Sequence, residues 1–314
     1  MMCHITPLHS DRQTSARLSL TTAVAASLLA ALSLAASADE TPKAADTAAD
    51  TDAAVLRVCA STSELPFSGQ DKSGFENRIA EVVAEAMGRS VQFIWSTKPG
   101  IFAVRDQLNM KLCDVVMGLD TGDDRVLTTR PYYRAPYIFV QRKDSKLNIE
   151  NWDSPDLQRA EKISYIPGTA GEVMLTKLDL ITKHVNYMHS LTNFQDKRNK
   201  YTRVPPERMM AEVADGTADL AVVFAPDVAR YMKANDKLKM TVIPDNNVRV
   251  DGEPVPHHFD QSLAVRKDDK DLRAAIDAAV EKAKPKIEAI LKEEGIPLLP
   301  APPPRSSKDM RQDK

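Results

Sequence analysis

The chain has 314 residues, and its 42 basic and 44 acidic side chains give a formal net charge of −2. This near-neutral balance gives no reason to expect nucleic-acid binding, and an aromatic content of 5% argues against a large stacking surface for bases or sugars. The length allows one large or two medium-sized domains.

The first 38 residues have the pattern of a secretory signal peptide. Arg12 and Arg17 precede an apolar run over residues 18–34, and Ala-Ser-Ala at 36–38 supplies a cleavage site. The run is short for a bilayer span, and the cleavage site follows at once. We therefore expect the signal peptide 1–38 to be removed and the mature chain to be exported without a membrane-spanning segment.

Two flanking segments have compositions that cannot build a core. Residues 39–54 are mostly Ala, Asp and Thr and are expected to form a flexible leader. Residues 300–314 are rich in proline and then in charge, which predicts a disordered tail. The folded body is therefore expected over 55–299.

Strand and helix patterns alternate in the first part of this body. Residues 74–88 have apolar side chains at helical spacing and end in Gly88, which predicts a helix and its stop. Such alternation predicts a parallel sheet with right-handed crossovers. The other elements expected here are strands over 55–60, 91–95, 114–117 and 137–141 and a helix over 104–110.

A second alternating unit follows and predicts a second lobe, with a cleft between the two. Its last helical pattern runs over 268–294 and contains Pro285, which is expected to kink the helix or divide it. The other elements expected here are strands over 162–166, 219–224, 240–243 and 262–266 and helices over 170–180, 206–215 and 226–233.

Cys59 and Cys113 are the two cysteines beyond the signal peptide. In an exported chain they are most simply a disulfide, and the alternative is a pair of buried free thiols. Cys59 ends the first expected strand and Cys113 precedes the third. These strands are neighbours in a 2-1-3 sheet order, so a bridge is geometrically feasible.

Arg125 is the clearest candidate for a ligand-binding group. It follows the apolar run that ends in Gly118, at the sheet edge where open α/β folds bind ligands. An arginine there can hold a carboxylate with two parallel hydrogen bonds. The alternative is an ion pair with Asp120, Asp123 or Asp124, which would make the guanidinium less available to a ligand.

Five further residues complete the set of candidates for the ligand cleft. Asp120 and Thr121 lie in the same turn as Arg125. The pair Gly168-Thr169 begins a helix, where free backbone N–H groups can hold an anion, although an ordinary capped turn has the same pattern. Phe67 is either a stacking wall of the cleft or a packed core residue.

The histidines do not have the spacing of a metal site. Adjacent residues on a strand face opposite ways, so His257 and His258 cannot easily bind one metal. His184 and His189 are expected on the surface. No Cys-x-x-Cys-His motif for a c-type haem is present, and no other cofactor is expected.

The order of these motifs resembles the type II periplasmic solute-binding proteins over roughly 55–299. The resemblance implies an α/β fold of two lobes, each a mainly parallel sheet flanked by helices, with the ligand cleft between them. It places lobe 1 at 55–144 and 244–299 and lobe 2 at 145–243. The motifs that carry it are Leu65-Pro-Phe-Ser-Gly69, Gly74-Phe-Glu76, the turn 118–125 with Pro131-Tyr132, Gly168-Thr169, 216–223 and 262–267.

The sequence departs from this pattern where amino-acid-binding relatives hold their ligand. They place a threonine three residues before the arginine, where this chain has Gly122, and Thr121 is one step away. They also place an acid after the second-lobe strand, where this chain reads Val-Phe-Ala-Pro over 223–226. A buried ammonium without a carboxylate partner is costly, so standard amino-acid binding is not expected.

A closer resemblance is to the MxaJ family, also called MoxJ, with the XoxJ family as the near alternative. It implies a non-enzymatic periplasmic accessory of methanol oxidation, whose partners are a pyrroloquinoline-quinone (PQQ) methanol dehydrogenase and its cytochrome c. The alternative is a solute-binding protein that delivers a small carboxylate-containing ligand to an ABC transporter. The motifs that carry the resemblance lie at 75–81, 104–108, 113–118, 120–122, 126–133, 186–191, 256–258 and 293–298.

The segment 184–203 places aromatic side chains beside a basic run in the second lobe. Such a segment offers aromatic anchors with a charged rim to a protein partner. The alternative is a solvated loop. The candidates for this surface are Tyr187, Phe194, Arg198 and Tyr201.

Overall fold

The structure is a computed structural model that describes residues 54–192 and 204–300. The expected signal peptide 1–38, nearly all of the leader 39–54 and nearly all of the tail 300–314 lie outside the described residues. Phe194, Arg198 and Tyr201 lie outside them as well. Among the described residues, no helix is both long and apolar enough to cross a membrane.

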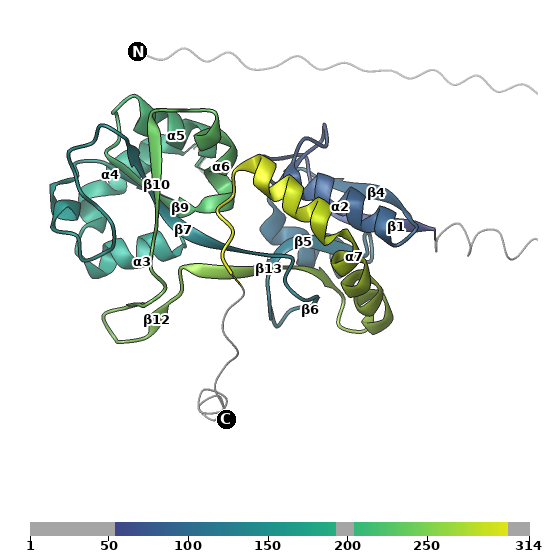
Figure 1. Ribbon diagram of the computed structural model, residues 1–314. Coiled ribbons are helices and arrows are strands. Elements are labelled where there is room, and N and C mark those ends of the chain that lie inside the picture. The colour runs from purple at the N-terminus through teal and green to yellow at the C-terminus, as the bar shows by residue number, and fades with distance from the viewer. Residues whose placement is uncertain (1–53, 193–203, 301–314) are drawn as a thin grey trace, which may run out of the picture. The chain divides into compact units, whose positions relative to one another are not determined.

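One path of paired strands runs through both lobes, in the order β4-β1-β5-β13-β7-β9-β8 (Figure 1). In addition, β10 pairs with β7 and β6 pairs with β13. The bounds are β1 Val55–Ser61, β4 Ser90–Ser96, β5 Val115–Asp120, β6 Leu127–Thr128, β7 Tyr133–Arg142, β8 Ile163–Tyr165, β9 Leu220–Phe224, β10 Leu238–Val242 and β13 His258–Val265. Two small hairpins join β2 Ser63–Glu64 to β3 Ser68–Gly69 and β11 Asn247–Val248 to β12 Pro254–Val255.

The strand directions show a mixed sheet, in which the parallel pairs of each lobe are flanked by antiparallel ones. In the first lobe β1 pairs in parallel with β4 and β5, which is the expected 2-1-3 order. The expectation that the next strand, β7, continues this parallel ladder is wrong, because β13 returns and inserts antiparallel between β5 and β7. In the second lobe β8 and β9 are parallel, and β7 runs against both β9 and β10.

Each lobe has its own hydrophobic core. In the first, helices α2 (Phe75–Ala86) and α7 (Lys270–Glu294) pack together and contribute Phe75, Ile79 and Ile276 to the core (Figure 1). The second is built around β7 to β10. It contains α3 (Ala170–Lys177), α4 (Ile181–Leu191), α5 (Pro206–Ala214) and α6 (Ala225–Lys233). The first part of β7 belongs to one core and the second part to the other.

Three helical segments differ from expectation. Helix α7 runs through Pro285 as one element of 25 residues, so of the two expected effects of this proline, a kink or a division, the division does not occur. Its buried face continues on both sides of the proline, with Val280 before and Ile287 after it, and this packing compensates for one lost hydrogen bond. Instead of a helix over 104–110, a short 3₁₀ turn Gly100–Phe102 is followed by a π-helical turn Val104–Leu108. Helix α4 was not expected.

Candidate functional site

The disulfide between Cys59 and Cys113 is confirmed. Its Cα atoms are 5.4 Å apart, and 54 positions separate the two residues in the sequence. Both cysteines are buried. The bond joins β1 to Cys113, two residues before β5, so it fixes the first-lobe strands that carry the candidate cleft.

Arg125 is held by an acid of its own turn. Its Nε donates to Asp123 Oδ1 at 3.0 Å, its Nη2 donates to Oδ2 at 2.5 Å, and its backbone N–H donates to Oδ1 at 2.9 Å. These hydrogen bonds lower the pKa of Asp123 and raise the pKa of Arg125. Of the alternatives for Arg125, the ion pair with Asp123 is the one present in the structure.

Asp120 and Thr121 are both engaged by β13. Gln261 Nε2 donates to Asp120 Oδ1 at 2.6 Å. The hydroxyl of Thr121 lies 2.6 Å from that of Ser262, and its backbone N–H donates to the Asp260 carbonyl at 2.8 Å. The structure therefore brings both residues beside Arg125 but uses their polar groups to join β5 to β13.

The turn at Gly168-Thr169 also binds a carboxylate of the chain. The Gly168 N–H donates to Glu172 Oε2 at 2.6 Å, and the Thr169 hydroxyl donates to the Ile166 carbonyl at 2.6 Å. Gly168 has a φ of 80°, which a glycine adopts without strain. As with Arg125, the anion-binding group expected here already has an internal carboxylate as its partner.

A cavity of about 250 Å³ lies in the first lobe, at the candidate cleft. Phe67 contributes to its wall and also packs on Phe75, with ring centroids 5.0 Å apart. Arg125 lines the cavity as well. The buried polar residues that line it are Ser61, Ser68, Glu76, Asn77 and Gln107.

Glu76 is the most unusual group of this cavity. Only 4% of the residue is exposed, and the Tyr132 hydroxyl donates to its carboxylate at 2.6 Å. The Tyr133 hydroxyl lies 3.5 Å from Oε1. Burial raises the pKa of Glu76 to about 7, although the two tyrosine hydroxyls lower it. A Cβ on Gly118 would lie 3.1 Å from Oε1, so a larger residue there would crowd the carboxylate.

In the sequence, Glu76 is part of the motif Gly74-Phe-Glu76, and nothing there pairs it with a tyrosine. The two partners are 56 residues apart in the chain, and only the fold brings them together. The available signal was an acid immediately after the core residue Phe75, at a position where a helix buries its first turn.

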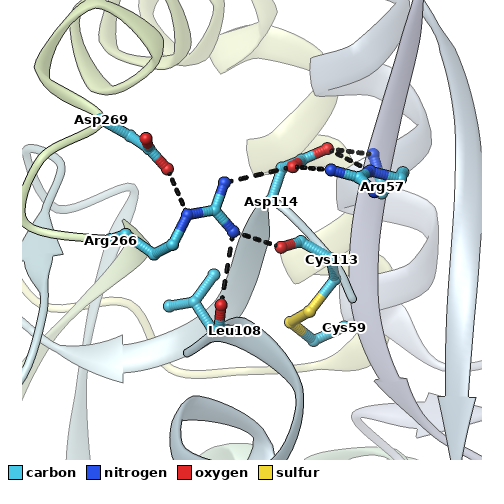
Figure 2. Close-up of polar contacts among 7 residues, drawn as sticks. All are labelled: Arg57, Cys59, Leu108, Cys113, Asp114, Arg266 and Asp269. Carbon is cyan, nitrogen blue, oxygen red and sulfur yellow. Dashed lines mark hydrogen bonds and ion pairs between the residues drawn. A yellow bond between two sulfur atoms is a disulfide. The ribbon is translucent and has the colours of Figure 1, made fainter. Parts of the chain in front are cut away.

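A cluster of charges lies beside the disulfide and was also missed (Figure 2). Arg57 forms two hydrogen bonds with the Asp114 carboxylate, at 2.9 and 2.7 Å. Arg266 donates from Nη1 to the Cys113 carbonyl at 2.6 Å and to the Leu108 carbonyl at 3.3 Å. Its Nη2 lies 3.3 Å from Asp114, and its Nε lies 2.7 Å from Asp269. The cluster thus connects β1, β5, β13 and the start of α7.

His257 is a structural residue that joins the segment before β13 to Trp152 of the second lobe. It is buried, and Trp152 Nε1 donates to its Nε2 at 2.9 Å. Its Nδ1 therefore carries the proton and donates to the Val255 carbonyl, 2.8 Å away. Burial lowers the pKa of His257, which favours this neutral form. His258 is half-buried, with Nε2 2.9 Å from the Ile243 carbonyl.

The expectation that His184 lies on the surface is wrong, whereas His189 is exposed as predicted. Both residues lie on the unexpected helix α4, whose buried face carries His184, Met188 and Leu191. The backbone N–H of Ile163 donates to His184 Nδ1 at 3.3 Å. Within 54–192 and 204–300, no group of three or more His, Cys, Asp or Glu side chains could hold a metal ion.

Tyr187 also lies on α4 and is half-buried. Its hydroxyl donates to Glu212 Oε2 at 2.8 Å, and its ring packs against the second-lobe core. Its role in a partner surface stays a prediction. The other three candidates for that surface lie outside the described residues.

The fold and these cleft positions match a known class of protein. The sequence profile of the bacterial extracellular solute-binding proteins, family 3, matches residues 56–293. The chain belongs to this family. Several solved structures of amino-acid-binding proteins share the fold at low identity, for example an ancestral cationic amino-acid-binding protein at 21% identity and a TM-score of 0.59.

Within the family, the chain belongs with the MoxJ proteins, also called MxaJ. It is 51% identical to protein MoxJ of Methylorubrum extorquens over 297 residues, 93% of this chain and 98% of that one. It is 45% identical to the crystal structure of MxaJ from Methlophaga aminisulfidivorans, with a TM-score of 0.75, covering 78% of this chain and 100% of that one. The periplasmic binding protein XoxJ of Methylobacterium extorquens is less similar, at 26% identity and a TM-score of 0.59.

Proposed function

We propose that this chain is a periplasmic, non-enzymatic accessory of a methanol oxidation system and that it binds the PQQ-dependent methanol dehydrogenase. Its similarity to the MoxJ proteins over almost its whole length supports the assignment to that system. The observation that carries the proposal is that Arg125 and Gly168, the two expected carboxylate-binding groups, hold the internal acids Asp123 and Glu172.

These internal contacts weaken the case for a small carboxylate ligand. A ligand would have to displace Asp123, which is two residues from Arg125 and always present at a high effective concentration. It would also have to compete with Glu172 at the second-lobe turn. A protein partner, by contrast, binds through area outside the cleft and needs neither group.

A solute-binding protein for a small ligand is the second candidate, and the cavity of about 250 Å³ beside Glu76 favours it. Catalysis has less support. The buried acid Glu76 is bonded to neutral tyrosine hydroxyls, and the cavity lining contains no histidine to act with it as a general base.

Two measurements on the mature chain separate these functions. In the first, the chain and purified PQQ methanol dehydrogenase are analysed by sedimentation, separately and mixed, and we expect a complex. In the second, the chain alone is melted with a panel of carboxylates, amines and small alcohols, and we expect no stabilisation. A ligand at one hundred times its dissociation constant would stabilise the fold by about 2.7 kcal/mol and would be easily seen.

The variant Asp123→Asn sharpens the second measurement, because it frees Arg125 without removing it. If the variant but not the wild type is stabilised by carboxylates, the internal ion pair blocks an inherited site. Stabilisation of the wild type together with no complex with the dehydrogenase would reject the proposed function in favour of solute binding.

A further inference from the structure

Exposed apolar side chains concentrate in one short segment of the first lobe. Of the seven large hydrophobic residues that are exposed within the described chain, three lie in this segment. They are Ile101, Met110 and Leu112, with exposed fractions of 71%, 65% and 51%. Met110 and Leu112 belong to the loop 109–112, which follows the π-helical turn and precedes Cys113; we call it the anchored loop.

Both ends of the anchored loop are fixed by one guanidinium (Figure 2). Arg266 donates to the carbonyl of Leu108 before the loop and to the carbonyl of Cys113 after it. Cys113 is further tied to Cys59 by the disulfide, and the next residue, Asp114, is paired with Arg57. The loop therefore projects its apolar side chains from a rigid base.

The conformation of the loop itself is unusual. Lys111, at its centre, has a φ of 58°, in the left-handed region that non-glycine residues rarely adopt. The preceding turn, Val104–Leu108, is π-helical, a form that is frequent at functional sites. Strain of this kind persists only where the surrounding contacts impose it, and here those contacts present Met110 and Leu112 to solvent.

The segment 98–114 has an excess of positive charge. Its basic residues are Lys98, Arg105 and Lys111, and Asp106 is shared by the first two of them. Its other acid, Asp114, is shared by Arg57 of β1 and by Arg266, which directly follows β13. Lys111 is exposed and forms no ion pair with another described residue. A partner surface that complements this segment has to be acidic around an apolar recess.

We propose that this chain docks on the dehydrogenase through the anchored loop. The loop would bind a face of the dehydrogenase that has an apolar recess with an acidic rim. The inference rests on the proposed function and names the surface that performs it. Met110 and Leu112 enter the recess of the partner, and Lys111 pairs with its acidic rim. Because Arg266 and the disulfide already order the loop, binding does not bear the full entropic cost of fixing it.

The test is equilibrium binding of the mature chain to immobilised dehydrogenase, for the wild type and three variants. We expect the double variant Met110→Ser/Leu112→Ser to weaken binding at least about tenfold, because central apolar anchors dominate such interfaces. We expect Lys111→Glu to weaken binding and to reverse its salt dependence. Val250→Ser, which removes an even more exposed apolar side chain (83%) from the turn between β11 and β12, is the matched control and should bind as the wild type.

Each result has one meaning. If the wild type binds and the double variant binds equally well, the docking surface is wrong while the proposed function stands. If the wild type does not bind the dehydrogenase, the proposed function fails and the inference fails with it. Self-association of the wild type that the double variant abolishes would identify a second copy as the occupant of the loop and overturn the inference. Unchanged thermal melting of all variants establishes that they fold.

Discussion

The buried carboxylate of Glu76 makes the stability of this protein depend on pH in a direction opposite to that of most acidic groups. Its pKa is raised from 4.5 to about 7 because burial disfavours the charged form. Between these values the unfolded chain has lost the proton and the folded chain has kept it. The folded state therefore binds more protons, and stability falls as pH rises through this window.

The magnitude follows from the two pKa values. A rise from 4.5 to about 7 corresponds to a loss of about 3 kcal/mol once both states are ionised. Between about pH 5 and about pH 8.5 the wild type should lose roughly 2 to 3 kcal/mol from this group alone. Burial raises the pKa of Tyr132 and of Tyr133 far above this range, so neither tyrosine ionises.

The perturbation is Glu76→Gln, which keeps the shape of the side chain but cannot ionise. Urea unfolding at about pH 5 and about pH 8.5 measures the free energy of unfolding. Between these pH values the wild type should lose roughly 2 to 3 kcal/mol of it from Glu76, and the variant should not. Other titrating groups, including His184 and His257, are common to both proteins and cancel in the comparison. The exposed residue Glu288 provides the matched control Glu288→Gln, which should follow the wild type. Equal pH dependence of Glu76→Gln and wild type would refute the assignment.

Three further predictions concern the residues that hold the site in place. Replacing Cys59 and Cys113 by serine should lower the unfolding free energy by about 4 kcal/mol, measured by urea denaturation, because the disulfide restrains a long loop of the unfolded chain. Gly118→Ala should cost about 1 to 2 kcal/mol in the same assay, because Gly118 has a φ of 64° and the new Cβ approaches Glu76. Trp152→Phe should cost about 1 to 3 kcal/mol in thermal melts, because it leaves His257 Nε2 buried without a donor, and a neutral outcome would contradict the assigned tautomer.

Local sequence patterns were sufficient to predict the helices and strands whose apolar residues recur at regular spacing. Helix α2 was expected because its apolar residues recur at helical spacing, and its end was expected because a glycine follows them. In the structure Gly88 has a φ of 72°. The disulfide followed from the count of cysteines in an exported chain and from the sheet order. Helix α4 was missed because its sequence, Ile-Thr-Lys-His-Val-Asn, mixes polar and β-branched residues of low helix propensity.

Contacts between distant residues could not be predicted in the same way. The insertion of β13 between β5 and β7 depends on a pairing between strands more than one hundred residues apart. The bonds of Arg266 to Leu108 and Cys113 depend on that insertion, and so does the anchored loop. At Arg125, sequence reasoning identified an internal ion pair as an alternative, but only the structure identifies Asp123 as the partner.

The proposed binding of the dehydrogenase is tested most directly by an equilibrium binding measurement between the mature wild-type chain and purified PQQ methanol dehydrogenase, with and without a panel of small carboxylates and amines. We predict a saturable complex whose dissociation constant is unchanged by every member of the panel, because Asp123 and Glu172 already occupy the carboxylate-binding groups. No complex with the dehydrogenase, together with a small molecule that binds the chain alone, would contradict it.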